Sequence, residues 1–164
     1  MNAAATKADV ERELIEAWQA LASAVDSFSD MELEQPGVGE GWSVKDLLGH
    51  IAFWAQEAAC NLPLIAADKA GDVRRPGDDK ALAEWNERER RLRQGRPLHE
   101  VRAEWLESYQ KAMQALAAFP SEKLQEELDG RTVLELFAED TLEHYREHLA
   151  QLSGWRKELE TTEA

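Results

Sequence analysis

Residues 140–155 read DTLEHYREHLAQLSGW and hold two of the chain's four histidines, His144 and His148, four positions apart. On a helical wheel at about 100° per residue, with Asp140 at zero, His144 falls at about 40° and His148 at about 80°. Four large apolar residues in and just before this segment also fall between about 20° and about 120°: Val133, Phe137, Leu152 and Trp155. This pattern predicts an amphipathic helix whose two histidines share the buried stripe.

Three other segments repeat apolar residues every three or four positions, as a helix with one buried face does. They cover residues 8–28, residues 43–63 and residues 97–120. The last helix is expected over residues 132–159, and a shorter, highly charged helix over residues 79–95. No segment keeps a period-two alternation rich in β-branched residues, so we expect no β-strands.

Capping and turn signals set the predicted ends of two helices. Ser43 and Asp46 match the S-x-x-D capping pattern, and Thr132 and Glu135 form a second capping box at the start of the last helix. Pro63 is expected either to kink the second helix or to end it.

Four long amphipathic helices can bury all their apolar stripes together by forming a bundle. The predicted fold class is therefore all-α: a four-helix bundle in which a long crossover, carrying the short charged helix, joins helix two to helix three. Residues 1–164 are expected to form a single domain, because a chain of this length buries about 70% of the surface of its unfolded form. The crossover leaves the directions of the helices open.

Composition narrows the classes of partner. The formal net charge is −14, and 43% hydrophobic residues with six tryptophans favour a packed domain over disorder. Because such a surface repels a phosphate backbone and an anionic bilayer, we expect no nucleic acid and no membrane as partners. Cys60 has no partner for an internal disulfide, and no run approaches the ~18 apolar residues of a membrane span. We therefore expect a cytoplasmic location.

Two buried imidazoles need partners for their ring nitrogens, because each unsatisfied buried polar group costs about 1–3 kcal/mol. A divalent ion, zinc or nickel, satisfies both rings, since an i, i+4 histidine pair on one helix face forms a two-point clamp. His50, at the edge of the second helix's apolar stripe, is the candidate third ligand, whereas His99 beside Pro97 is expected in solvent. The hypothesis is a three-histidine metal site of His50, His144 and His148. The alternative is that the pair is a core or surface feature without metal.

Other residues near this predicted site have both a functional and a structural interpretation. Asp140, one turn before the first histidine of the pair, is the candidate catalytic residue that handles a proton or orients a ligand; alternatively it is a surface carboxylate. Trp54 and Phe137 are candidate walls of a substrate pocket. Trp42 and Trp85 flank the start of helix two and the crossover, so we expect them near the mouth of the bundle.

The run HYREH over residues 144–148 also matches H-x-x-E-H, the pattern of inverzincin metallopeptidases, in which the glutamate is the general base. Glu147 lies about 100° from His148 on the wheel, and those enzymes are mixed α/β proteins, whereas no sheet is expected here. The metallopeptidase interpretation is therefore set aside. The arginine-rich run RERRLR over residues 88–93 is expected to be a solvated face.

Two segments resemble the DinB-like (DinB/YfiT) superfamily of bacterial four-helix proteins: GWSVKDLLGHIAFW over residues 41–54 and EHYREHLAQLSGW over residues 143–155. Residues 85–124 and the run TLEHYREH over residues 141–148 look most like its ClbS/DfsB branch. The resemblance covers most of the chain.

The resemblance implies metal-ligand roles for His50, His144 and His148, the same three residues that the wheel selects. It also implies a bundle with a crossover connection and frequent homodimers, so a second copy of the chain is an expected partner. Members of the superfamily include S-transferases and isomerases that use low-molecular-weight thiols, and the branch includes a self-protection enzyme that hydrolyses a reactive cyclopropane. Where the branch usually has an asparagine, this chain has Asp140, which adds a base or a negative charge.

Together these observations predict a metal-dependent enzyme, a hydrolase or a thiol S-transferase, whose ion activates water or a thiol against a small electrophilic substrate. The alternative is a non-catalytic stress-response bundle that binds a metal or another ligand.

Overall fold

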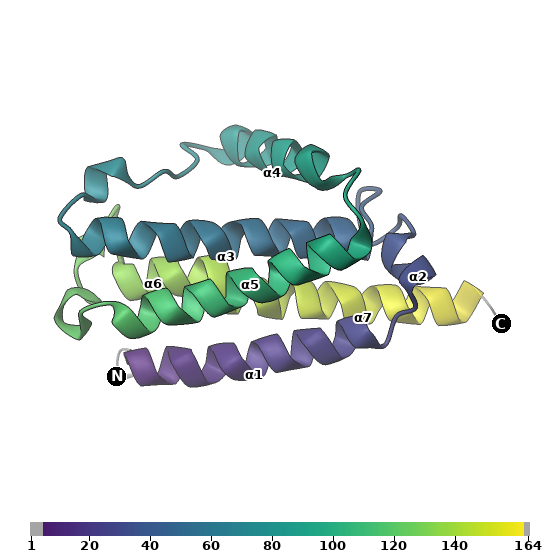
Figure 1. Ribbon diagram of the computed structural model, residues 1–164, viewed down its shortest axis with the longest axis horizontal. Helices are drawn as coiled ribbons and strands as arrows, with labels where there is room; N and C mark the ends of the chain where they lie inside the picture. The colour runs from purple at the N-terminus through teal and green to yellow at the C-terminus, as the bar shows by residue number, and fades with distance from the viewer. Residues whose placement is uncertain (1–4, 163–164) are drawn as a thin grey trace.

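The computed structural model describes residues 5–162, and its long helices lie side by side as a bundle (Figure 1). The predicted all-α bundle class is confirmed. In chain order the elements are α1 (Lys7–Asp26), α2 (Asp30–Glu34), α3 (Val44–Ala66), η1 (Ala70–Asp72), α4 (Asp79–Arg93), α5 (Leu98–Ala118), η2 (Ser121–Lys123), β1 (Glu127–Leu128), β2 (Arg131–Thr132), α6 (Val133–Ala138), the π-helical segment η3 (Glu139–Glu143) and α7 (His144–Thr162).

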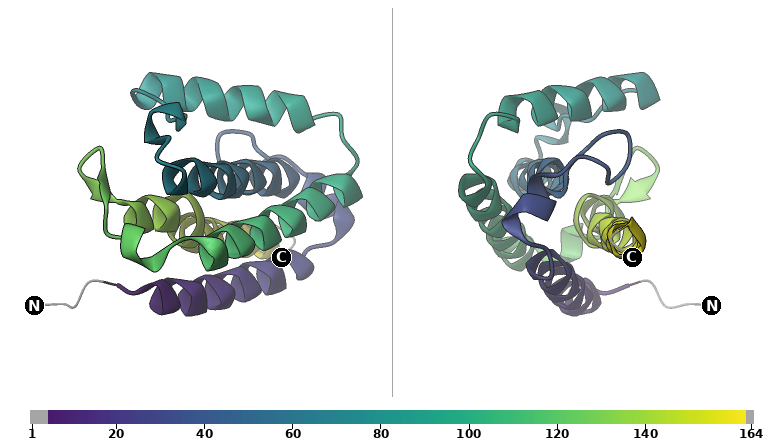
Figure 2. Two further views of the ribbon diagram at one scale, coloured as in Figure 1. Left: turned by 60° about the vertical axis from the view of Figure 1, so that its left-hand side comes forward. Right: turned by 90° about the vertical axis from the view of Figure 1, so that its right-hand side faces the viewer.

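The bundle helices run in two directions, which resolves the topology that the sequence left open. Helices α3 and α5 run the same way, while α1 and the continuous α6–η3–α7 run the opposite way (Figure 1). The crossover returns along the outside of α3 as α4, and this return allows α3 and α5 to be parallel (Figure 2). Within the bundle, α3 packs on α5 and α1 packs on α7. No helix within residues 5–162 is both long and apolar enough to cross a bilayer.

Both predicted capping boxes are confirmed. The Ser43 hydroxyl accepts a hydrogen bond from the Asp46 backbone N–H at 3.1 Å, and the Asp46 carboxylate accepts one from the Ser43 N–H at 3.0 Å. Thr132 and Glu135 make the same reciprocal pair before α6. These pairs satisfy N–H groups that have no partner within the helix. Helix α3 includes Pro63 and continues to Ala66.

Two short features differ from the prediction. The expectation of no strands is wrong, because β1 and β2 form a hairpin around Asp129 and Gly130. Both turn residues have positive φ, 55° and 79°, as a two-residue hairpin turn requires. Strands of two residues are too short to show a period. Helix α2, with its own capping box at Ser29, was also not predicted, because five residues make little more than one helical turn.

The last helix is interrupted by the π-helical segment η3. Its wider turn adds one residue, so every later position is rotated by about 100° from where a regular helix would place it. The helical wheel that joined Val133 and Phe137 to the histidines is therefore wrong across residues 139–143. The histidines nonetheless face inward, since His148, one turn after His144, is buried.

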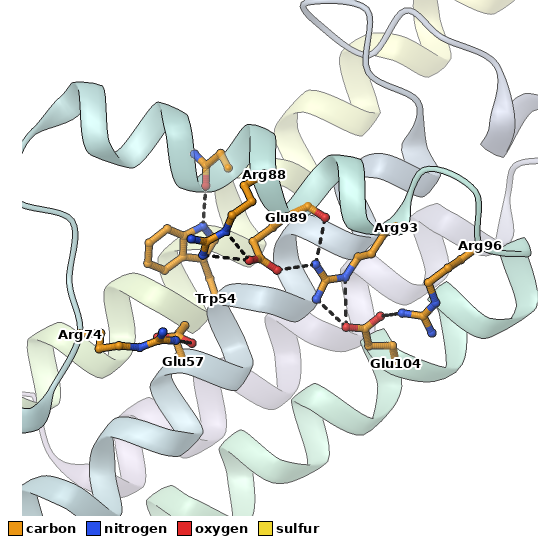
Figure 3. A network of polar contacts seen from close by, with 9 residues as sticks. Trp54, Glu57, Arg74, Arg88, Glu89, Arg93, Arg96 and Glu104 are labelled. Carbon is orange, nitrogen blue, oxygen red and sulfur yellow. Dashed lines mark hydrogen bonds and ion pairs between the residues drawn. The ribbon is translucent and has the colours of Figure 1, made fainter.

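Helix α4 lies outside the bundle and has no buried residue. Polar and aromatic contacts attach it to α3. The Trp54 indole N–H donates to the Asn86 side-chain oxygen at 3.0 Å (Figure 3). Trp85 stacks on Trp54 with ring centroids 6.2 Å apart. This helix is therefore held by side-chain contacts at its surface rather than by an apolar stripe.

Arg93 fastens the end of α4 to α5. Its guanidinium pairs with Glu104 at 2.7 Å and with Glu89 at 2.9 Å (Figure 3). Gly49 on α3 makes room for this side chain, because a Cβ there would lie 2.7 Å from Cδ of Arg93. The expectation that residues 88–93 form a solvated face is thus wrong at Arg93, whose side chain is only 11% exposed.

We expect that replacing Tyr145 with phenylalanine stabilises the bundle. Tyr145 is fully buried and its hydroxyl has no hydrogen-bond partner among the described residues, so Tyr145→Phe should raise the free energy of unfolding by about 1 kcal/mol. Denaturant titration measures the change. The control Tyr109→Phe alters a partly exposed phenol and should change stability by less than about 0.5 kcal/mol. A loss of stability in Tyr145→Phe would contradict the expectation.

Candidate metal centre

Three histidine side chains meet where α3 faces the start of α7. Nε2 of His50 lies 2.9 Å from Nε2 of His144. The ring centroid of His148 is 5.2 Å from that of His50 and 4.6 Å from that of His144. One nitrogen from each ring lies within 4.8 Å of the other two. The structure thus brings together all three residues that the sequence singled out, and their role as ligands stays a prediction.

Local structure explains this convergence. The capping box at Ser43 fixes where α3 begins, and His50 follows two turns later. His144 directly follows η3 as the first residue of α7, and His148 is one turn further along the same face. The extra residue of η3 therefore sets the direction in which both α7 histidines point.

Hydrogen bonds within the protein do not satisfy the three rings. One N–H···N bond joins His50 to His144 in a suitable tautomer, and Nδ1 of His148 lies 2.9 Å from the side-chain oxygen of Gln151. Nδ1 of His50, Nδ1 of His144 and Nε2 of His148 have no hydrogen-bond partner among the described residues. Because an unsatisfied buried group costs about 1–3 kcal/mol, the free Nε2 of His148 favours an additional partner for the cluster.

Burial keeps the three imidazoles neutral. It is the main cause that lowers the pKa of His50 to about 3, with smaller contributions from His148 and Arg93. Burial also lowers the pKa of His144 well below its ordinary value, and it lowers the pKa of His148 against the opposing hydrogen bond to Gln151. A neutral imidazole has a free lone pair, and this is the form that binds metal ions.

The donor set fits a divalent transition metal. The Gln151 oxygen can only accept a hydrogen bond, so Nδ1 of His148 carries the proton and the lone pair is on Nε2. Two nitrogens bound to one ion at about 2.1 Å are about 3.4 Å apart in tetrahedral geometry and about 3.0 Å apart at a right angle. The observed separation between His50 and His144 is 2.9 Å. Neutral nitrogen ligands of this kind suit zinc and nickel.

Gln151 is a candidate site residue that the sequence patterns did not single out. Its amide accepts from His148 and donates to the backbone carbonyl of Val38, so both ends of the amide are fixed. Gly39, with φ of 112°, allows this approach, since a Cβ there would lie 2.9 Å from Nε2 of Gln151. The i, i+3 spacing from His148 was an available signal, but the contact with Val38 is not visible in the sequence.

A cavity of about 460 Å³ opens beside the cluster. Its lining includes the three histidines, Trp54 of α3, the first turns of α4 with the linker before it, and Asp140 of η3. A molecule in this cavity therefore reaches the histidines and the Asp140 carboxyl together. The cavity is also roomy enough for a small ligand.

The interpretation of Asp140 as a surface carboxylate is wrong, because the residue is only 8% exposed. Burial raises its pKa to about 7, while Arg75, whose Nη1 lies 3.6 Å from Oδ2, acts in the opposite direction. The structure places Asp140 in the wall of the cavity that the histidines also line. Its catalytic role stays a prediction.

The aromatic candidates take different places. Trp54 lines the histidine cavity, whereas Phe137 lies in the core and lines a small neighbouring cavity that shares Asp140. Trp42 packs edge-on against the His50 ring at a centroid distance of 5.5 Å, so it supports a candidate ligand from the side. His99 is exposed in the first turn of α5, as predicted.

Comparisons with known proteins agree on the fold. A family model described as the mycothiol maleylpyruvate isomerase N-terminal domain matches residues 14–152. The crystal structure of the colibactin self-resistance protein ClbS in complex with double-stranded DNA aligns with a TM-score of 0.83 at 15% identity, covering 94% of this chain and 98% of that chain. An uncharacterised protein from Escherichia coli UTI89 aligns with a TM-score of 0.78 at 17% identity, covering 94% of this chain and 95% of that chain. No curated protein sequence matches the chain.

The exclusion of nucleic acid as a partner is wrong. ClbS, which has the same fold, forms a complex with double-stranded DNA. Net charge averages the whole surface, whereas a nucleic acid contacts one face of a protein. In this chain, exposed guanidinium groups of Arg74, Arg88 and Arg91 occur on α4 and the linker before it despite the net charge of −14. The net charge therefore does not decide the question.

Gln151→Ala should release the His148 ring. In metal-free wild-type protein we expect a single His148 tautomer with the proton on Nδ1, because the amide oxygen accepts that proton. Gln151→Ala should give a mixture of tautomers in long-range ¹H–¹⁵N correlation spectra. The control Gln151→Glu keeps an acceptor and loses only the bond to Val38, so it should keep the single tautomer. A single Nδ1–H tautomer in Gln151→Ala would mean that another group orients the ring.

Proposed function

This chain belongs to the mycothiol maleylpyruvate isomerase N-terminal domain family, and from that premise we propose that it is a metal-dependent hydrolase or thiol S-transferase. Its substrate is a small electrophile, and the nucleophile is water or a low-molecular-weight thiol. One observation carries the proposal: three neutral imidazoles converge at the wall of a cavity that also holds a buried carboxyl group.

His50, His144 and His148 would hold the ion, with zinc and nickel as the candidates. A divalent ion on three neutral ligands keeps its full charge and, when bound, lowers the pKa of a water or thiol beside it. Gln151 keeps the His148 lone pair directed at the cluster. Trp42 holds the His50 ring in place by edge-on contact.

Asp140 is the proposed proton acceptor. Its carboxylate faces the same cavity, so it can take the proton that the water or thiol loses as it attacks. Arg75, which lines the same cavity, lies 3.6 Å from that carboxylate and can orient it. Trp54 walls the cavity and limits the water that reaches the reacting groups. Use of a reduced thiol agrees with the cytoplasmic location that we propose, since thiols are kept reduced there.

The alternative is a binding protein that uses the same histidines without turnover. Such a protein would take up metal through His50, His144 and His148 and would not need Asp140. Metal binding and turnover therefore have to be measured separately.

Binding to duplex DNA is a second candidate function. It is favoured by the ClbS–DNA complex together with the exposed guanidinium groups of Arg74, Arg88 and Arg91 in this chain. Arginine side chains of this kind contact phosphate groups and release counterions, so the binding would weaken as salt rises.

Metal analysis tests the site. Protein purified without an affinity tag should take up about one equivalent of zinc or nickel. His148→Ala should lose it, because two remaining imidazoles do not make a stable site. Asp140→Asn is the matched control, since it alters the same cavity without removing a nitrogen ligand, and it should keep the metal. Uptake below roughly a tenth of an equivalent by the wild-type protein would exclude the proposed site.

The same three proteins separate enzyme from binder in a screen of thiol transfer to small electrophiles and of their hydrolysis. Asp140→Asn should retain metal and lose turnover by roughly 10²-fold or more, the usual size of general-base catalysis. Turnover that survives metal removal, or that Asp140→Asn leaves unchanged, would contradict the mechanism.

The DNA candidate is tested by charge reversal. Arg74→Glu, Arg88→Glu and Arg91→Glu together should weaken binding to a short duplex, measured by fluorescence anisotropy at low salt, by roughly tenfold or more. The control reverses three exposed cations elsewhere, Arg12, Lys111 and Arg146, and should weaken binding much less. Equal losses in both variants, or no binding by the wild-type protein, would exclude a specific DNA-binding face here.

A further inference from the structure

The charged side chains of the histidine cavity fall into a paired and an unpaired group. Arg75 and Arg131 are its cations. Both guanidinium groups pair with Glu139, Arg75 at 3.5 Å, and Arg75 also faces Asp140 at 3.6 Å. Both arginines therefore already have carboxylate partners, although the Arg131 side chain is 45% exposed.

Three carboxylates of the same cavity make no ion pair among the described residues: Asp78, Asp79 and Glu147. Asp78 accepts a hydrogen bond from the Ala81 backbone N–H at 2.8 Å as the N-cap of α4. These carboxylates come from two walls, the start of α4 and α7. Without a bound ion, the side chains that line the cavity thus carry a net negative charge.

A second observation shows that this cavity is built for a ligand. His148, which lines it, is 7% exposed, and its Nε2 has no hydrogen-bond partner among the described residues. The cavity therefore has two electrostatically different ends. The histidine end takes a metal ion and a nucleophile, while the other end offers unpaired negative charge.

We infer that the thiol or the electrophile used by this site carries a cationic group, an ammonium or a guanidinium, that lies against Asp78, Asp79 and Glu147. This inference rests on the proposed function and adds the charge of the substrate. An anionic ligand of equal size would meet three carboxylates and no unpaired cation among the lining residues, so the cavity selects against it.

Three thiols of equal length test the inference: cysteamine, 2-mercaptoethanol and 3-mercaptopropionate, which carry a positive charge, no charge and a negative charge away from sulfur. Their dissociation constants from Co²⁺-loaded protein are measured by the thiolate-to-cobalt absorption band. The variant is Asp78→Asn, Asp79→Asn and Glu147→Gln combined. Asparagine at position 78 can still cap α4. For each thiol, the dissociation constant from the variant is divided by that from the wild-type protein. Differences in pKa among the three thiols therefore cancel.

Neutralising the three carboxylates should weaken cysteamine binding by about fivefold or more and tighten 3-mercaptopropionate binding by a similar factor, leaving 2-mercaptoethanol within about twofold. The control variant, Glu16→Gln, Glu122→Gln and Glu158→Gln, makes the same change in net charge at exposed positions outside the cavity. It should leave all three constants within about twofold.

The outcomes distinguish a failure of the cationic preference from a failure of the proposed metal-dependent function. Normal cobalt uptake with equal effects on all three thiols, or equal effects of both variants, would overturn the cationic preference and leave the metal site standing. Absence of cobalt uptake by the wild-type protein would overturn the proposed function and this inference with it.

Discussion

Three imidazole rings share one largely desolvated space between α3 and α7, at the wall of the cavity that they line. Burial removes their charge, and neutrality leaves each ring with a lone pair. Gln151 holds one ring in a single tautomer, and the carbonyl of Val38 holds Gln151 in turn. The close approach of that loop depends on Gly39. The hydrogen bond of the His148 ring therefore also constrains Val38 and Gly39, which lie far from the histidine in the sequence.

Helix α4 is held in place by a different kind of interaction from the bundle helices that it covers. The bundle helices are held by burial of apolar side chains. Helix α4 is held by ion pairs and an indole hydrogen bond (Figure 3), and by aromatic stacking. Because its residues need not fill a core, its first turn can carry charged groups into the cavity wall. The crossover thus supplies the polar side of a site whose histidines come from the bundle.

The fold is shared with ClbS at only 15% identity. This is expected of a helical bundle, since its core needs apolar residues of suitable size at helical spacing rather than particular residues. The same tolerance means that the chemistry cannot be taken from the fold. The chemistry of the site depends instead on the three histidines, the buried carboxyl of Asp140 and the charges around them.

The sequence by itself determined the longer helices, two capping boxes and the identity of the three histidines, because apolar spacing and capping act over one or two turns of a chain. Only the tertiary structure decided the parallel course of α3 and α5, the π-helical segment before His144, the burial of Asp140 and the contact between Gln151 and Val38. Each of these depends on segments distant in sequence. Their contact energies and desolvation arise only when the helices pack together.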